Sequence, residues 1–241
     1  MTLTREDIAL ARALVIHEDA HVIAFNKPSG LAVQGGSGVT RSLETLLGAF
    51  AKSNGKQPRL VHRLDRDTSG VIIAARTKPA AAFFSAAFAS REVKKTYIAL
   101  VCGGAPSPET GEIAFALKKS SRRGLDIMEV AADGQAALTR YRTLSASPEA
   151  ALVELSPETG RMHQLRAHMA AIARPIAGDG KYGGLYRIGG TDIPRLLLHA
   201  AALDAPYPDG GRRRFAAALP VDFEKAAQSL GLEAPNVRDT C

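Results

Sequence analysis

A charged segment that leads straight into an apolar run is the feature that most constrains this chain. The segment reads His62-Arg63-Leu64-Asp65-Arg66-Asp67-Thr68-Ser69-Gly70, and the run that follows is Val71-Ile72-Ile73-Ala74-Ala75. A short continuous apolar run with several β-branched residues is typical of a buried strand. The Thr-Ser-Gly sequence before it is typical of a turn. The sequence therefore predicts a polar loop that a buried strand holds at the edge of the core.

Two carboxylates in this segment, Asp65 and Asp67, are candidates for chemistry. Alternate side chains of an extended chain share a face, so both carboxylates and Arg63 are expected on one side. A cation within about 4–6 Å favours the charged, nucleophilic form of a carboxylate. The same residue types also form ordinary turns and ion pairs that only pin a loop. Residue types alone therefore leave catalysis and a structural role both open.

The charge balance favours a polyanionic partner. The 241 residues include 31 Lys and Arg against 24 Asp and Glu, a formal net charge of +7. Basic side chains that neutralise phosphates gain free energy from counterion release. No apolar run reaches the roughly 20 residues that span a bilayer, and the first residues lack the pattern of a signal peptide. We therefore expect a cytoplasmic protein that does not enter a membrane.

Motifs for cofactors and disulfides are missing from the sequence. The glycine cluster at residues 35–38 does not continue as G-x-G-x-x-G, because Arg41 occupies the last position. Cys102 and Cys241 do not form a C-x-x-C pair, which argues against a zinc knuckle or a disulfide framework. We expect no nucleotide cofactor.

Residues 160–168, Gly-Arg-Met-His-Gln-Leu-Arg-Ala-His, form a second charged segment. A helix beginning near Arg161 would place Gln164, Leu165 and His168 on one face with it. His163 and His168 are five residues apart, about 140° around a helix, whereas zinc-binding pairs are four apart on one side. We therefore expect no metal site here.

Periodicity predicts alternating helices and strands elsewhere in the chain. The predicted helices are 4–14, 42–52, 79–90 and 221–230, and the predicted strands are 15–17, 22–25, 71–75, 96–101, 135–145 and 150–155. Tyr97 lies in one of these strands, where a tyrosine usually packs half-buried. Lys118, Lys119, Arg122 and Arg123 form a basic stretch that fits either a solvated hairpin tip or a contact with RNA backbone.

Four segments together resemble the motifs of the RluA-type pseudouridine synthases. They are residues 26–30 (N-K-P-S-G), 62–70 (H-R-L-D-x-x-T-S-G), 95–100 (K-x-Y-x-A-L) and 160–168 (G-R-x-H-Q-[IL]-R-x-H), in the order of that family. The resemblance covers about Val15 to Leu219. It implies an α+β fold with a central mixed, largely antiparallel sheet flanked by helices and loops. We expect one catalytic domain over residues 1–241 that works as a monomer. The sequence departs from many relatives in one respect, because we expect no separate N-terminal S4 RNA-binding domain ahead of Val15.

The resemblance implies isomerisation of uridine to pseudouridine in structured RNA, with no cofactor. Asp65 takes the position of the catalytic aspartate, Arg161 that of the arginine that pairs with it, and Tyr97 that of the tyrosine lining the active site against the uracil ring. Arg63 matches the residue expected to fill the space that the flipped uridine leaves. The residues expected to contact RNA are Lys27, Arg63, Arg66, Lys94, Lys95, His163, Gln164 and Arg166.

The substrate is less constrained than the reaction. The run at residues 26–38 looks most like members that modify 23S ribosomal RNA, and transfer RNA is the main alternative. A non-catalytic RNA-binding or ribosome-assembly protein would also suit a basic chain. A glycoside hydrolase could use Asp65 and Asp67, although its usual tryptophan platforms are missing because the chain has no Trp.

Overall fold

The computed structural model describes residues 3–36, 40–122 and 124–237, which contacts divide into two compact units. Unit 1 comprises Met1–Lys94 and Ala200–Ala218, and unit 2 comprises Lys95–His199 and Leu219–Cys241. The expectation of a single catalytic domain stays a prediction. Ser37, Gly38, Arg123 and Cys241, considered above, lie outside the described residues, as does the side chain of Arg122.

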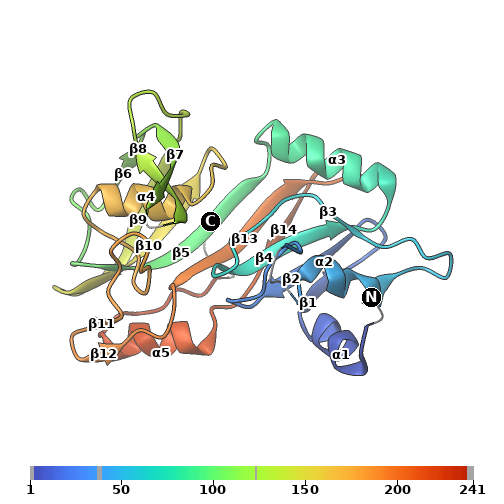
Figure 1. The fold of residues 1–241 in the computed structure, drawn as a ribbon, viewed down its shortest axis with the longest axis horizontal. Helices are drawn as coiled ribbons and strands as arrows, with labels where there is room; N and C mark the ends of the chain where they lie inside the picture. Colours follow the sequence, from blue (N-terminus) through green and yellow to red (C-terminus); the bar gives the residue numbers. More distant parts are fainter. Residues whose placement is uncertain (1–2, 37–39, 123, 238–241) are drawn as a thin grey trace. The chain divides into compact units, whose positions relative to one another are not determined.

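Unit 1 is built on an antiparallel sheet in which β4 is central. The strands are β1 (Val15–Glu18), β2 (Val22–Lys27), β3 (Arg59–Leu60), β4 (Ser69–Ala75), β13 (Leu198–Pro206), which begins in unit 2, and β14 (Arg212–Ala216) (Figure 1). β2 and β3 both pair antiparallel with β4, and β14 pairs antiparallel with β13. Every residue of β4 is buried, as its apolar run predicts. Gly70 has φ +112°, and a Cβ there would lie 2.2 Å from the Ala200 carbonyl oxygen, so only glycine allows this close approach to β13.

Helices complete unit 1. They are α1 (Arg5–Ala13), α2 (Leu43–Leu46), the 3₁₀ turn η1 (Leu47–Phe50) and α3 (Lys78–Ala89). Thr4 caps α1 through a capping box with Asp7, and Thr77 caps α3 by accepting from the Ala80 amide. The apolar face of α3 contributes Phe84 to the core formed with strands β2, β4, β13 and β14. The predicted helix 42–52 is therefore shorter and ends as a 3₁₀ turn.

Unit 2 contains antiparallel strands of a sheet and a separate hairpin. The sheet runs β5 (Lys94–Cys102), β10 (Ala150–Pro157), β9 (Thr139–Ala146) and β6 (Thr110–Ile113), and the hairpin is β7 (Leu117–Arg122) with β8 (Leu125–Val130). α4 (Gln164–Ala171), β11 (Arg187–Ile188), β12 (Thr191–Asp192) and α5 (Val221–Ser229) complete the unit. Leu165 and Met169 of α4 pack on β5, β9 and β10 in one buried cluster.

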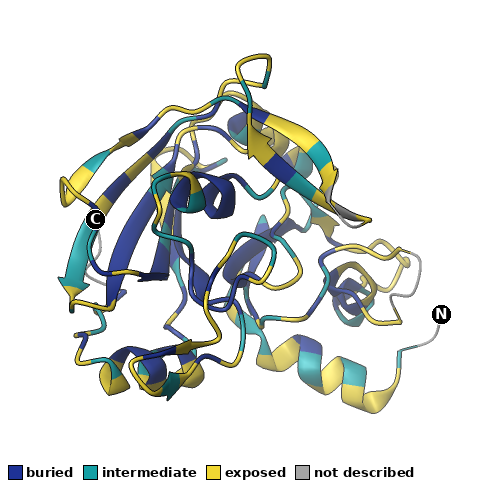
Figure 2. Ribbon diagram, turned by 60° about the vertical axis from the view of Figure 1, so that its left-hand side comes forward, coloured by how far each residue is buried: buried dark blue, intermediate teal, exposed yellow. Residues whose placement is uncertain are grey.

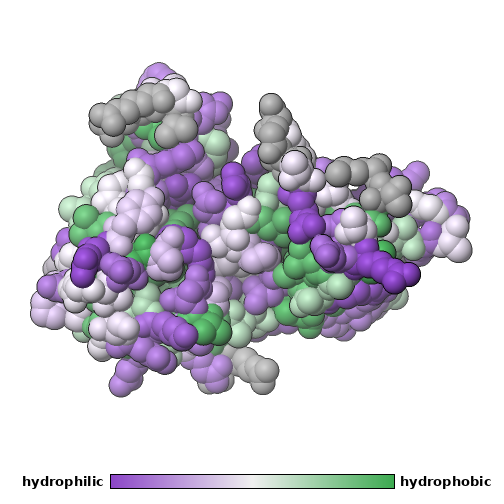
Figure 3. Space-filling view, turned by 60° about the horizontal axis from the view of Figure 1, so that its bottom comes forward, coloured by the Kyte–Doolittle hydropathy of each residue, from purple (hydrophilic) through white to green (hydrophobic). Residues whose placement is uncertain are grey.

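Burial is concentrated in five strands. β2, β4, β5, β10 and β13 are buried along most of their length, whereas β1, β6, β9 and β14 are mostly intermediate or exposed. Figure 2 accordingly shows dark blue strands beside teal and yellow ones, and helices with both buried and exposed residues. Figure 3 shows a face on which hydrophilic and hydrophobic residues are interspersed. Among the described residues, no helix is both long and apolar enough to cross a membrane. The predicted α+β class with a largely antiparallel sheet is confirmed.

The start of α4 corrects one prediction. The helix begins at Gln164, so Arg161 lies in the turn before it and does not share a helix face with Gln164, Leu165 and His168. The physical reason is His163, which has φ 50° in the left-handed region and cannot continue a right-handed helix. A positive φ at a non-glycine residue is costly, and the contacts described below hold it in place.

Candidate active site

Asp65 lies on the loop 61–68 of unit 1, between β3 and β4. The Thr68 amide donates to the Asp65 carbonyl oxygen at 3.2 Å, so these residues form a tight turn. The prediction that Arg63, Asp65 and Asp67 share one face of an extended chain is therefore wrong. Leu64, 6 % exposed, anchors the loop in the core, while Asp65 is half-buried and Asp67 is exposed. The turn thus separates the environments of the two carboxylates.

The N-K-P-S-G segment holds the far side of this loop. The Gly30 amide donates to the Arg66 carbonyl oxygen at 3.0 Å, and Arg66 Nε donates back to the Gly30 carbonyl oxygen at 3.1 Å. Ser29 Oγ donates to the Asp67 carbonyl oxygen at 2.7 Å. Backbone carbonyl oxygens accept all three bonds, and two of these acceptors, on Arg66 and Asp67, belong to the loop, so the segment fixes the path of the loop directly after Asp65.

Lys27 is the centre of this contact. Its side chain is 0 % exposed, and Nζ donates to the carbonyl oxygens of Pro28, Leu31 and Arg66 at 3.0, 2.9 and 2.9 Å. A buried ammonium is tolerated only where it is well hydrogen-bonded. The expectation that Lys27 contacts RNA is therefore wrong, because the ammonium is enclosed and binds the loop backbone. Arg63 and Arg66, by contrast, are exposed.

Tyr97 and the neighbouring lysines lie on β5. Tyr97 is half-buried and pairs across the sheet with Leu155 of β10. Lys95 Nζ donates to the Thr159 carbonyl oxygen at 3.4 Å, which ties the start of β5 to the segment that precedes Arg161. Lys94 is exposed. Tyr97 therefore lies two residues after Lys95, which contacts the segment that precedes Arg161.

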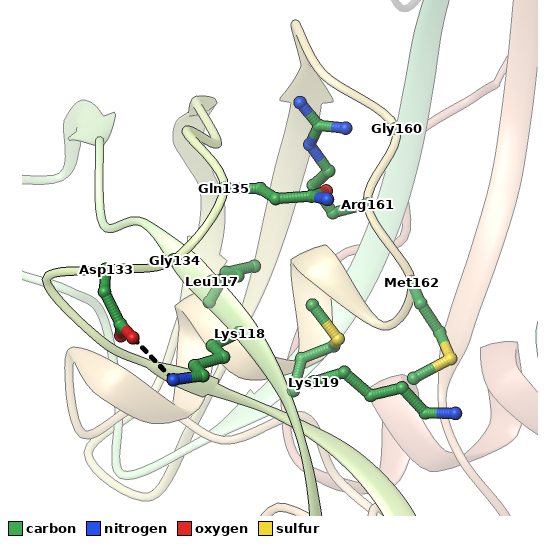
Figure 4. Close-up of a pocket in the computed structure, with 10 residues that line it drawn as sticks. Leu117, Lys118, Lys119, Asp133, Gly134, Gln135, Gly160, Arg161 and Met162 are labelled. Carbon is green, nitrogen blue, oxygen red and sulfur yellow. Dashed lines mark hydrogen bonds and ion pairs between the residues drawn. The ribbon is translucent and has the colours of Figure 1, made fainter.

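Arg161 lines a pocket of about 370 Å³ in unit 2 (Figure 4). Its Nε donates to the Ala136 carbonyl oxygen at 3.3 Å. In Figure 4, Arg161 lies beside Gln135 at one end of the pocket, with the Lys118–Asp133 ion pair at another and Lys119 near Met162. Lys119 pairs with Asp126 on β8. The basic residues that β7 brings to the pocket are thus partly neutralised by neighbouring carboxylates.

Gln164 sets the position of the Arg161 backbone. Its Oε1 accepts from the Arg161 amide at 3.1 Å and from Thr159 Oγ1 at 2.6 Å. Its Nε2 donates to the Leu138 carbonyl oxygen and to Thr139 Oγ1, both at 3.0 Å. Gln164 is buried and uses both ends of its carboxamide inside the protein. The expectation that Gln164 contacts RNA is therefore wrong.

Arg166 is also internal. It is 5 % exposed and forms a bidentate pair with Asp179, in which Nε and NH2 each donate at 2.7 Å to one carboxylate oxygen. The expectation that Arg166 contacts RNA is wrong for this reason. His163 is half-buried, and its Nδ1 forms a hydrogen bond with the hydroxyl of Tyr182 at 3.0 Å, while that hydroxyl accepts from the Met128 amide at 2.7 Å. Tyr182 therefore helps to hold the left-handed His163.

His168 closes a buried chain of hydrogen bonds beneath these residues. Its Nε2 donates to the Phe115 carbonyl oxygen and its Nδ1 accepts from Thr139 Oγ1, both at 2.9 Å. Thr139 in turn accepts from Gln164. Burial lowers the pKa of His168 from its ordinary value, and the bond to Phe115 opposes this only in part. A neutral imidazole thus supports the residue that positions Arg161.

Sequence reasoning assigned no role to three of these supporting residues. Ser29, Asp179 and Tyr182 lie in segments that match the family, but a serine in a turn or an aspartate in a glycine-rich loop gives no sign of its partner. The partners are 38 residues away for Ser29 and 13 for Asp179. Among the described residues, no group of three or more His, Cys, Asp or Glu could hold a metal ion.

Comparison with known proteins identifies the family. A family model described as RNA pseudouridylate synthase matches residues 21–171, which include the Lys27 segment, the Asp65 loop, Tyr97 and α4. The chain belongs to the RNA pseudouridylate synthases. The resemblance to the RluA-type branch is therefore confirmed, and the chain is an enzyme that isomerises uridine in RNA.

Individual relatives of this synthase cover most of the chain. It is 35 % identical over 231 residues to the ribosomal large subunit pseudouridine synthase C of Escherichia coli strain K12, covering 93 % of this chain and 72 % of that protein. It is also 35 % identical to the mitochondrial pseudouridylate synthase RPUSD4 of Xenopus tropicalis, covering 94 % of this chain and 83 % of the relative. The structure of human RNA pseudouridylate synthase domain containing 4 aligns with a TM-score of 0.83 at 29 % identity, covering 97 % and 100 % of the two chains.

Removal of the buried ammonium should loosen the Asp65 loop. We expect Lys27→Met to lower the free energy of unfolding by roughly 2–4 kcal/mol, because three carbonyl oxygens lose a charged donor. The exposed Lys94→Met is the matched control and should change it by less than about 0.5 kcal/mol. Urea denaturation at neutral pH measures both. Equal stability of the two variants would show that the carbonyl oxygens find other donors.

The buried His168 should make stability depend on pH. Its folded pKa lies below its unfolded value of about 6.5, so the unfolded state takes up the proton first as pH falls. The neutral, buried imidazole contributes fully to the free energy of unfolding above the unfolded pKa, and this contribution is lost as pH falls through and below that pKa. The free energy of unfolding of the wild type should therefore decline more steeply below about pH 6.5 than that of His168→Gln, which lacks this proton site. Denaturation curves across this range compare the two slopes, and parallel slopes would contradict the prediction.

Proposed function

We propose that this RNA pseudouridine synthase uses Asp65 as its catalytic carboxylate and acts on uridines of 23S ribosomal RNA. The observation that carries the proposal is the loop itself. Asp65 occupies the aspartate position of the H-R-L-D motif, and it is half-buried on a turn whose following residues are fixed by three backbone-directed contacts. A catalytic group must be held within a narrow range of positions to act.

The reaction suits one carboxylate. The bond between C1′ of the ribose and N1 of uracil breaks, the base turns, and C5 forms a new bond to C1′. The proton on C5 is released, and N1 takes up a proton, so atoms and electrons balance without an oxidant or a hydrolytic water. An ionised carboxylate can attack the sugar, attack the base or accept a sugar proton. Each of these roles requires a negative charge beside the glycosidic bond.

Arg161 and Tyr97 complete the proposed catalytic group. In the proposal, the guanidinium of Arg161 keeps Asp65 ionised and oriented by a charge-assisted hydrogen bond. Tyr97 offers its ring to the uracil face, which offsets part of the cost of unstacking, since a stacked base is typically worth about 1–3 kcal/mol. The fixed backbone of Arg161, held through Gln164, and the half-buried ring of Tyr97 support these roles.

The RNA must reach this group with its target uridine extruded. The basic residues proposed to contact the RNA backbone are the exposed Arg66 and Lys94, together with Lys95 and His163, which are half-buried. The exposed Arg63 is proposed to occupy the space left by the uridine. Electrostatic contacts of this kind weaken as salt concentration rises.

Ribosomal RNA is the proposed substrate on two grounds. The Escherichia coli relative is named a ribosomal large subunit synthase, and the sequence at residues 26–38 resembles members that act on that RNA. Transfer RNA is the second candidate, because the matching family is described by its action on RNA without naming the class of RNA. We also propose that the enzyme works as a monomer in the cytoplasm.

Neutralising Asp65 should abolish turnover and leave RNA binding intact. Asp65→Asn keeps the shape of the side chain and removes its charge, so we expect tritium release from RNA containing 5-tritiated uridine to fall at least about a thousandfold. Asp67→Asn is the matched control, since its side chain is exposed on the same turn, and should keep activity within about threefold. A filter-binding assay checks that both variants bind the RNA. Normal turnover by Asp65→Asn would refute its assignment, and equal losses in both variants would revive a two-carboxylate reaction.

The RNA of cells that lack the protein identifies the substrate. We expect pseudouridine mapping of total RNA to show specific uridines of 23S ribosomal RNA left unmodified, and the wild-type gene but not Asp65→Asn to restore them. Loss confined to transfer RNA would contradict the proposed substrate and leave the reaction intact. No change in any RNA would contradict both.

A further inference from the structure

The stretch of loop before Asp65 is held by a side chain, whereas the stretch after it is held through the backbone. β3 pairs with β4 through Arg59 opposite Ala75 and Leu60 opposite Ala74, and this short strand ends there. The next amide along β4, that of Ile73, donates instead to Nε2 of His62 at 2.9 Å. The imidazole therefore takes over from the β3 backbone as hydrogen-bond partner of β4.

A second contact fixes the plane of the same ring. The imidazole of His62 stacks on the ring of Phe88 with a centroid separation of 4.3 Å and an interplanar angle of 20°. Phe88 lies on α3 and packs against the core of unit 1, to which α3 also contributes Phe84. His62 is therefore held from two directions, by an amide of β4 and by an aromatic ring of α3.

We propose that His62 is a positioning residue that fixes Asp65 through its neutral imidazole, with the proton on Nδ1. The inference rests on the proposed role of Asp65. Only two residues, Arg63 and Leu64, lie between the two positions, and Leu64 is buried, so the backbone has little freedom to move Asp65 independently of His62. With the Lys27 contacts beyond Asp65, the loop is held on both sides of the carboxylate.

The chemistry of the contact selects the form of the ring. A backbone amide can only donate, so Nε2 must accept, and a neutral imidazole then carries its proton on Nδ1. A doubly protonated imidazole has no acceptor and would leave the buried Ile73 amide facing another donor. Glutamine can supply an acceptor oxygen, whereas phenylalanine can stack on Phe88 but cannot accept.

Two substitutions at this position separate the contacts. We expect His62→Phe to lower kcat for tritium release about 10- to 100-fold, because a small misplacement of a catalytic group has effects of this size. KM and the dissociation constant for RNA should stay within about threefold, since no proposed RNA contact is removed. His62→Gln should recover most of the lost kcat, and Phe88→Leu, which removes only the stack, should lose less kcat than His62→Phe.

Nitrogen NMR measures which nitrogen of the His62 ring carries the proton, independently of activity. In protein labelled at its six histidines, the resonances missing from His62→Gln identify His62. An unprotonated Nε2 with a proton on Nδ1 supports the proposal, and a proton on Nε2 overturns it. Wild-type kcat in a folded His62→Phe also overturns it. If His62→Phe does not fold, His62→Gln is compared with His62→Ala, where a higher kcat for His62→Gln supports the proposal and equal values overturn it.

Failure of the proposed function would look different. A wild type that releases no tritium, or an active Asp65→Asn, removes the proposed reaction or the role of Asp65, whatever the state of His62. Failure of the His62 proposal appears only as a wrong tautomer or as unchanged kcat in variants of an active wild type.

Discussion

A single buried ammonium organises the carboxylate-bearing loop. Lys27 Nζ donates to three carbonyl oxygens from two segments that are about 40 residues apart in the chain, and one of them is the Arg66 carbonyl oxygen within the turn that begins at Asp65. Burying such a charge is costly unless all its donors are used. Once the two segments adopt any other path, the ammonium loses its partners. The geometry around Asp65 is therefore coupled to the folding of unit 1.

The arginine-bearing segment of unit 2 depends on a different kind of contact. A chain of neutral side chains, from His168 through Thr139 to Gln164, ends at the Arg161 amide, and each member donates or accepts inside the protein. Networks in which every polar group is satisfied specify one arrangement strongly. One segment is thus anchored by charge and the other by a neutral network, and both leave the proposed reacting side chains at least partly accessible.

Sequence reasoning predicted the helices and strands better than the roles of individual residues. The apolar run predicted β4, and periodicity predicted a helix over residues 4–14, where α1 begins at Arg5, because both signals are local. The start of α4 was misplaced, since a left-handed histidine is stabilised by Tyr182, nineteen residues away. Lys27, Gln164 and Arg166 were assigned to RNA because basic or polar residues in a motif suggest a ligand. Their burial depends on partners that only the fold brings near.

Gly70 shows what a family motif records. The motif H-R-L-D-x-x-T-S-G ends at Gly70, where β4 lies so close to the Ala200 backbone that only glycine fits. This requirement comes from strand packing and has no bearing on proton or glycosyl chemistry. Much of the motif by which such chains are recognised therefore consists of residues that support the fold. A descendant that exchanged its one carboxylate for another residue would keep nearly the whole signature, and membership of the family would then say nothing about turnover.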